Sequence, residues 1–269
     1  GYDFSSFKYF AGHSLGEYSA LVCSESLNFE DALYLLHERG KAMQAAVPVG
    51  QGSMIAVLGI KNEEIIDMLK LNRSNKGICE VANDNANGQI IISGNKNSVE
   101  AFQIILKEKK IKTIPLKVSA PFHCSLMQPA ADAMAEALAE TTILPPTVPL
   151  VANVTANEAR DPDEIRKNLV SQVTGRVRWR ESILVLKDKG VETLVETGAG
   201  KVLSGLARRI DPELSRSSVT TVSRKSVSFS ILKLNGIIGS MMMRGRRAGS
   251  SWPSSRSKDQ ERCCCAIRR

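Results

Sequence analysis

Residues 7–23 read FKYFAGHSLGEYSALVC, and their pattern gives the first indication of the fold class. Its first part is apolar and stops at a glycine, and its last part carries helix-forming residues, so it predicts a strand, a sharp turn and a helix. The turn at 12–16, GHSLG, fits the Gly-x-Ser-x-Gly pattern, in which small neighbours allow a strained serine to stand exposed above a sheet. The N–H of Leu15 and the helix N-terminus can then stabilise an oxyanion. The five letters also fit a glycine-rich turn, but the flanking strand and helix favour Ser14 as a nucleophile.

A serine nucleophile needs a base, and the chain contains only three histidines. His13 adjoins Ser14, where neighbouring side chains diverge, so packing or hydrogen bonding is its expected role. His37 lies in the middle of a predicted helix. His123 lies in the proline-containing loop 119–124, between a strand and a helix, where α/β enzymes place catalytic groups. We therefore predict His123 as the base, with an ordinary loop histidine as the alternative.

Arg39 is predicted to lie on the apolar face of a helix, together with Ala32, Leu36 and Met43. An arginine in that place needs a partner, and a guanidinium holds a carboxylate through two parallel hydrogen bonds. The residues alone leave two interpretations open. Arg39 binds an acidic substrate, or it extends from the helix end to water or to a surface glutamate.

Outward from the turn, strands and helices alternate along the chain. Residues 50–118 follow the order βαββαβ, which is typical of a ferredoxin-like unit and predicts an inserted subdomain. Residues 1–49 and 119–235 are predicted to form one discontinuous α/β core, a largely parallel sheet with helices on both faces. Residues 236–269 lack periodicity and read as a disordered tail, although a shifted reading frame or a cloning artefact produces the same pattern.

Composition excludes several function classes. The chain of 269 residues is 43% hydrophobic and 24% charged, as in a folded globular protein. Of the net charge of +8, residues 244–269 supply +6, and aromatic residues make up only 5%, so we expect no nucleic-acid face. The six cysteines have no metal-ligand spacing, and three form the run 263–265. No apolar run approaches the roughly 18 to 20 residues of a membrane span, so we expect a cytoplasmic protein.

Taken together, the motifs resemble the malonyl-CoA:acyl carrier protein transacylases and the acyltransferase domains of polyketide and fatty acid synthases. The resemblance covers residues 11–210 in the family's order. It rests on these segments: GHSLGEY at 12–18, RG and MQ within 39–44, NDN and GQ within 83–89, APFH at 120–123, and ETGAGK at 196–201. It implies an α/β-hydrolase-like acyltransferase core.

The resemblance also implies a role for each site residue. Ser14 would attack the thioester of malonyl-CoA, His123 would take its proton, and Arg39 would bind the malonyl carboxylate. Gln172 would orient the histidine through its backbone carbonyl, and Asn83 would lie near the acyl pocket.

The implied reaction ends on a carrier protein. The malonyl group would pass to the phosphopantetheine thiol of acyl carrier protein, for fatty acid biosynthesis, in an enzyme that works as a monomer without metal or cofactor. Phe122 resembles the malonyl-selective version of the family, because a bulky ring would crowd the added methyl of methylmalonyl.

One family feature is missing from the sequence. Family members begin several tens of residues earlier, with a strand that ends in a Gly-Gln-Gly-Ser-Gln loop whose glutamine N–H supplies half of the oxyanion hole. Residues 50–53, GQGS, imitate that loop in letters but follow the nucleophile and open the predicted insertion. Losing one oxyanion donor costs on the order of 100- to 1000-fold in turnover. We therefore expect the chain as written to be poorly active or unstable.

Two other functions compete with acyl transfer. An α/β-hydrolase-type thioesterase shares the serine motif but needs a late histidine, and none occurs in the 146 residues after His123. A truncated acyltransferase that only binds carrier protein fits the missing strand, but it gives no purpose to an intact Ser14, His123 and Arg39.

Overall fold

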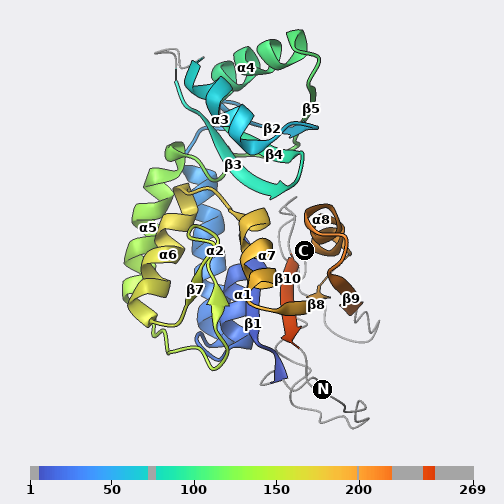
Figure 1. The fold of residues 1–269 in the computed structure, drawn as a ribbon. Helices are drawn as coiled ribbons and strands as arrows, with labels where there is room; N and C mark the ends of the chain where they lie inside the picture. The colour runs from blue at the N-terminus through green and yellow to red at the C-terminus, as the bar shows by residue number, and fades with distance from the viewer. Residues whose placement is uncertain (1–5, 72–76, 199, 220–238, 246–269) are drawn as a thin grey trace, which may run out of the picture.

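The computed structural model describes residues 6–71, 77–198, 200–219 and 239–245. Within these ranges, eight α-helices and two β-sheets form a mixed α/β fold (Figure 1). A larger sheet with its helices makes up the core, and a smaller sheet with two helices lies at one end of it. Among the described helices, none combines the length and the apolar character that crossing a membrane requires.

The core sheet has six strands in the spatial order β7-β6-β1-β10-β8-β9. Strands β6, β1, β8 and β9 run in one direction, whereas β10 and β7 run antiparallel to their neighbours. The sequence predicted a largely parallel sheet; four of the six strands share one direction, but the sheet is mixed, because β10 and β7 each pair antiparallel with their neighbours. The strands have these bounds: β1 Tyr9–His13, β6 Leu150–Val151, β7 Glu158–Ala159, β8 Val191–Thr197, β9 Ser215–Val219 and β10 Gly239–Gly245.

Strand β10 corrects the prediction of an irregular tail over 236–269. It pairs with β1 on one side and β8 on the other, in the middle of the core sheet (Figure 1). A central strand covered on both faces lacks the alternation of a half-buried strand, so the short run Met241–Met243 gives no periodic signal. Residues 236–238 and 246–269 of the predicted tail lie outside the described residues.

Helices cover both faces of the core sheet, as predicted. Adjacent strand residues show this, because Phe10 packs into one apolar cluster and Ala11 into the other. The first cluster includes residues of α1 (Gly16–Cys23), α2 (Phe29–Ala45), α5 (Gln128–Ala139) and α6 (Pro162–Thr174). The second includes residues of α7 (Trp179–Asp188) and α8 (Val202–Ile210).

The smaller sheet has the order β3-β4-β2-β5, and all its neighbours are antiparallel. Its elements follow the predicted chain order: β2 Gly52–Leu58, α3 Asn62–Leu71, β3 Cys79–Ala86, β4 Gln89–Asn95, α4 Lys96–Glu108 and β5 Lys112–Pro115. Alternate residues Ile90 and Ile92 face the two helices, whereas Ile91 joins a second cluster with Met54 and Ala82. Successive side chains of a strand point to opposite faces of the sheet, so Ile91 faces away from the two helices, and both faces of this sheet carry buried apolar residues.

Strand β3 joins the smaller sheet to the core. The Asp84 N–H donates to the Val177 carbonyl at 2.9 Å, and the Val177 N–H donates to the Ala82 carbonyl at 2.8 Å. The Asp84 side chain also pairs with Arg180 of α7 at 2.8 Å. Farther along, Glu80 accepts from the Ser125 N–H, at the start of the 3-10 helix Ser125–Met127. These contacts fix the smaller sheet beside the loop that carries His123.

Candidate active site

Ser14 occupies a strained turn between β1 and α1. Its φ of 53° lies in the left-handed region, which costs energy for any residue with a Cβ. The turn is tight because Gly12 approaches the next glycine closely: a Cβ on Gly12 would lie 1.9 Å from the Gly16 carbonyl carbon. Only glycine fits at position 12. The motif therefore has the backbone geometry that the sequence predicted for it.

Asn153 braces this turn from the segment just after the neighbouring strand β6. Its Oδ1 accepts from the Ser14 N–H at 2.7 Å, and its Nδ2 donates to the Gly12 carbonyl at 2.7 Å. One buried side chain thus spans the residues on both sides of His13. Sequence reasoning missed Asn153, although it comes just after β6, which runs parallel to β1 and ends at the same sheet edge.

His123 forms the contacts that a general base needs. The Ser14 hydroxyl donates to Nε2 at 2.8 Å, and Nδ1–H donates to the Gln172 carbonyl at 2.9 Å. The carbonyl can only accept, so it fixes the tautomer that leaves Nε2 free to take a proton. Burial, and secondly the positive charge of Arg39, lower the pKa of His123 to about 3. The imidazole is therefore neutral near pH 7 in this state.

Arg39 points into the site and not to solvent. Its side chain is buried, and Nη2 donates to the Ser14 hydroxyl oxygen at 3.1 Å and to Gln172 Oε1 at 2.9 Å. Burial lowers the pKa of this guanidinium. Its Nε has no hydrogen-bond partner in the described part of the chain. The solvent-exposed alternative is wrong, and the unused donor capacity fits an acidic ligand.

Gln172 contributes its side chain as well as its backbone. Its Nε2 donates to the Ser14 carbonyl at 3.1 Å and to Glu17 Oε2 at 2.6 Å, while its Oε1 accepts from Arg39. Sequence reasoning gave Gln172 only its backbone carbonyl and assigned no role to Glu17. The single available signal was a glutamate in the first turn of the helix that follows the nucleophile.

The remaining predicted residues lie around this cluster. The Leu15 N–H donates no hydrogen bond to any described residue, so it is available to a ligand oxygen. Asn83 is buried where β3 bridges to Val177, and its side chain forms no hydrogen bond within the described ranges. Phe122 is half-buried and packs against apolar clusters of both sheets.

The other two histidines are not bases for Ser14. His13 donates from Nε2 to Asn85 Oδ1 at 2.8 Å and packs against Trp179, with ring centroids 5.5 Å apart. It therefore has the packing and hydrogen-bonding role expected of it. His37 is exposed on α2. The described residues contain no group of three or more His, Cys, Asp and Glu side chains that could hold a metal ion.

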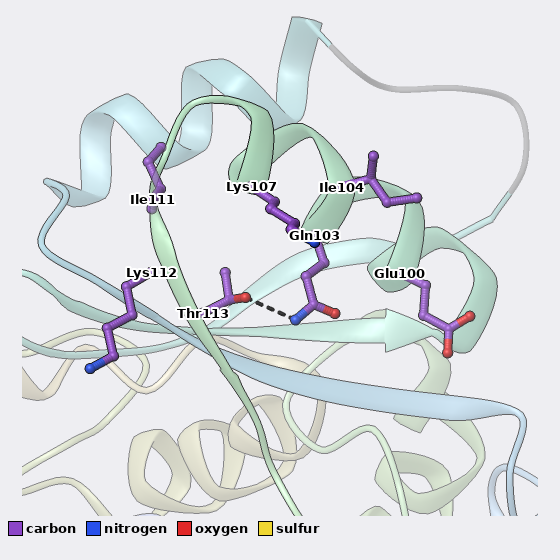
Figure 2. Close-up of a pocket in the computed structure, with 7 residues that line it drawn as sticks. All are labelled: Glu100, Gln103, Ile104, Lys107, Ile111, Lys112 and Thr113. Carbon is purple, nitrogen blue, oxygen red and sulfur yellow. Dashed lines mark hydrogen bonds between the residues drawn. The ribbon is translucent and has the colours of Figure 1, made fainter.

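A groove of about 560 Å³ lies elsewhere, on the outer side of the smaller sheet between α4 and β5 (Figure 2). Gln103 crosses it and donates to Thr113 at 2.8 Å. None of the predicted site residues lines this groove, and no histidine, serine or cysteine does. Its lining residues are Glu100, Gln103, Ile104, Lys107, Ile111, Lys112 and Thr113. It therefore lacks the nucleophile and base that acyl transfer needs.

Residues 7–210 match the family described as "Acyl transferase domain", and the chain belongs to that family. Two relatives are named malonyl CoA-acyl carrier protein transacylase. The one from Haemophilus influenzae is 44% identical over 214 residues, which are 79% of this chain and 68% of the relative. The one from Bacillus subtilis is 40% identical over 224 residues, covering 83% of this chain and 71% of the relative.

Solved structures of malonyl transferases are also similar to this chain. An acyl-carrier-protein-S-malonyltransferase from Bartonella henselae superposes with a TM-score of 0.79 at 47% identity, over 82% of this chain and 71% of that one. A malonyl-transacylase solved with its type II polyketide acyl-carrier protein has a TM-score of 0.75 at 42% identity, over 78% and 68% of the two chains.

Proposed function

We propose that this protein transfers the malonyl group of malonyl-CoA to the phosphopantetheine thiol of acyl carrier protein, through a malonyl-serine intermediate, in fatty acid biosynthesis. One observation carries the proposal: the Ser14 hydroxyl oxygen lies 2.8 Å from the His123 base nitrogen and 3.1 Å from an Arg39 donor. A nucleophile, its base and a carboxylate-binding group thus meet at one atom. The family and the names of the relatives supply the substrate and the carrier.

The first half-reaction acylates Ser14. His123 Nε2 takes the hydroxyl proton while Oγ attacks the thioester carbonyl, and the Leu15 N–H donates to the resulting oxyanion. When the tetrahedral intermediate collapses, the C–S bond breaks and His123 returns the proton to the departing thiol of coenzyme A. The Gln172 carbonyl holds the imidazole in place and accepts from Nδ1 throughout. A neutral carbonyl takes the place that a carboxylate has in the Ser-His-Asp triad.

The second half-reaction reverses these roles. The carrier thiol loses its proton to His123 Nε2 and attacks the malonyl ester. The Ser14–acyl bond then breaks, and the serine oxygen recovers the proton from the imidazolium. The free hydroxyl and the neutral histidine are restored, so atoms and charges balance over the cycle.

Arg39 selects acyl groups that end in a carboxylate. Its Nη2 contacts the Ser14 hydroxyl, and its Nε is unused, so a malonyl carboxylate beside Ser14 can receive two hydrogen bonds. The bound negative charge also offsets the positive charge that depresses the pKa of His123. Substrate binding therefore makes His123 a stronger base at the moment when acylation needs one.

The same proposal assigns the parts of the fold. The described residues of 6–49 and 119–219, together with β10, make up an α/β-hydrolase-like core, and those of 50–118 make up a ferredoxin-like subdomain, which fits the sheet order β3-β4-β2-β5. Asn83 lines the acyl pocket at the seam between them, and Phe122 restricts its width. The protein works as a cytoplasmic monomer without a cofactor.

Intact-protein mass spectrometry after mixing with malonyl-CoA tests the proposal. We expect one malonyl adduct, mapped to Ser14 by peptide sequencing, which is absent in Ser14→Ala. The Arg39→Ala variant should form it far more slowly. A folded wild-type protein that takes up no malonyl group would refute the assignment.

A further inference from the structure

Glu17 is a buried carboxyl group next to the site that the reaction steps above do not use. It lies in the first turn of α1 and is only 1% exposed. Its Oε2 accepts from Gln172 Nε2 at 2.6 Å and from the Asn153 N–H at 3.2 Å. These two residues are the ones that brace the Ser14 turn and hold Arg39. Glu17 therefore contacts both supports of the site.

The hydrogen-bond partners of Gln172 permit only one orientation of its amide. Arg39 is a donor and must face Oε1, whereas Glu17 Oε2 and the Ser14 carbonyl are acceptors and must face Nε2. Glu17 accounts for the shorter of the two Nε2 contacts. Without it, Nε2 would keep only the 3.1 Å contact to a neutral carbonyl, and the amide would be held less firmly in the orientation in which Oε1 accepts from Arg39.

We propose that Glu17 is a positioning residue for acyl transfer: its carboxyl group fixes the side-chain amide of Gln172, and that amide holds Arg39 where a malonyl carboxylate binds. The inference rests on the proposed function and deepens it, because it says what sets selectivity for an acidic acyl group. Glu17 itself touches neither the substrate nor the reacting atoms.

The burial of Glu17 argues against a purely structural role. Desolvation raises the pKa of this carboxyl to about 7, and its Oε1 has no hydrogen-bond partner in the described residues. An apolar side chain of similar size would avoid this cost. Glu196 gives the contrast, because it is also buried, yet both its oxygens accept backbone N–H groups of α8, from Leu203 and Ser204. Glu196 caps a helix and contacts none of the site residues.

The experiment compares the rates at which the protein is acylated by malonyl-CoA and by acetyl-CoA, whose acyl group has no carboxylate. Glu17→Met keeps the volume but removes the acceptor, and Glu17→Gln keeps an acceptor oxygen. Glu196→Met is the matched control for losing a buried carboxyl group.

We expect Glu17→Met to lower the malonyl-to-acetyl ratio of kcat/KM about 10- to 100-fold, mainly through KM for malonyl-CoA, as for a misplaced binding group. Glu17→Gln should stay within about threefold of wild type, and Glu196→Met should change stability but not the ratio.

A second variant keeps the test decisive if Glu17→Met does not fold. Gln172→Met removes the side-chain amide but keeps the backbone carbonyl, so it should lower the ratio as much as Glu17→Met is expected to. An unchanged ratio in either folded variant, or an equal fall in Glu196→Met, would overturn the inference. Failure of the wild-type protein to accept malonyl would instead refute the proposed function, which separates the two outcomes.

Discussion

The active-site turn and the smaller sheet are held together by different forces. Around Ser14, buried polar side chains meet across long sequence separations, 109 residues for the contact with His123 and 155 for that between Glu17 and Gln172. In the smaller sheet, alternate Ile and Val residues of β2 and β4 pack against two helices. The first region depends on the geometry of a few atoms, and the second on buried apolar area. Changes in the first should therefore alter the reaction, and changes in the second should alter stability.

Removal of the nucleophile should have the largest effect. Ser14→Ala deletes the atom that forms the acyl bond, so we expect malonyl transfer to fall on the order of 10⁴-fold or more, with little change in melting temperature. Steady-state transfer to carrier protein and a thermal melt measure the two effects. Transfer within tenfold of wild type would show that another group is the nucleophile.

A cavity in the smaller sheet should have the opposite effect. Ile92 is fully buried between β4 and the two helices, so Ile92→Ala should lower the free energy of unfolding by about 3 kcal/mol. Below its melting temperature, the variant should keep the malonyl-to-acetyl ratio of wild type. Ile104→Ala on the same subdomain is the control, because that side chain is 60% exposed. Chemical denaturation checks both, and a changed ratio in Ile92→Ala would break the proposed separation of roles.

The ionisation of Glu17 should appear as a pH-dependent stability. Burial raises its pKa from 4.5 to about 7, so the folded chain holds this proton more tightly than the unfolded chain does. Wild-type stability should therefore fall as the pH rises through this interval, and Glu17→Gln should be free of this loss. Between about pH 5 and pH 8, the unfolding free energy of the variant should gain about 3 kcal/mol relative to wild type. Urea denaturation at several pH values measures the difference, and a constant difference would contradict an ionising Glu17.

The charge of Arg39 should be visible in the titration of His123. After burial, this charge is the next largest cause of the depressed pKa of His123, so Arg39→Ala should shift that pKa upward. An NMR titration of the imidazole signals measures the shift. Arg160→Ala is the control, because Arg160 is exposed and pairs with Glu158 of β7. A pKa that stays the same or falls in Arg39→Ala would refute this electrostatic coupling.

The sequence predicted those parts of the molecule that depend on local pattern. The apolar run, the tight turn and the helix placed Ser14, and the helical face of α2 placed Arg39 among buried residues. The order of elements in the smaller sheet matches the βαββαβ order predicted from the succession of segments along residues 50–118. Only three histidines had to be considered, and the loop setting of His123 separated it from the other two.

The parts that sequence reasoning missed depend on tertiary geometry. Asn153 and the Gln172 amide reach Ser14 only after β6 and α6 have packed beside β1 and α1, and no local pattern records that proximity. Glu17 looks like an ordinary acidic residue in the first turn of a helix, where a negative charge stabilises the helix through its dipole. Strand β10 was missed because a short central strand carries no alternating pattern.

The fate of the malonyl-enzyme distinguishes transfer to a carrier protein from hydrolysis. We would isolate the malonyl-Ser14 form, divide it between buffer alone and buffer with phosphopantetheinylated acyl carrier protein, and follow the adduct mass over time. We expect the carrier protein to speed loss of the adduct well above its slow hydrolysis in buffer, with an equal gain of malonyl-carrier protein. Rapid release of free malonate without gain on the carrier would contradict it and identify a thioesterase.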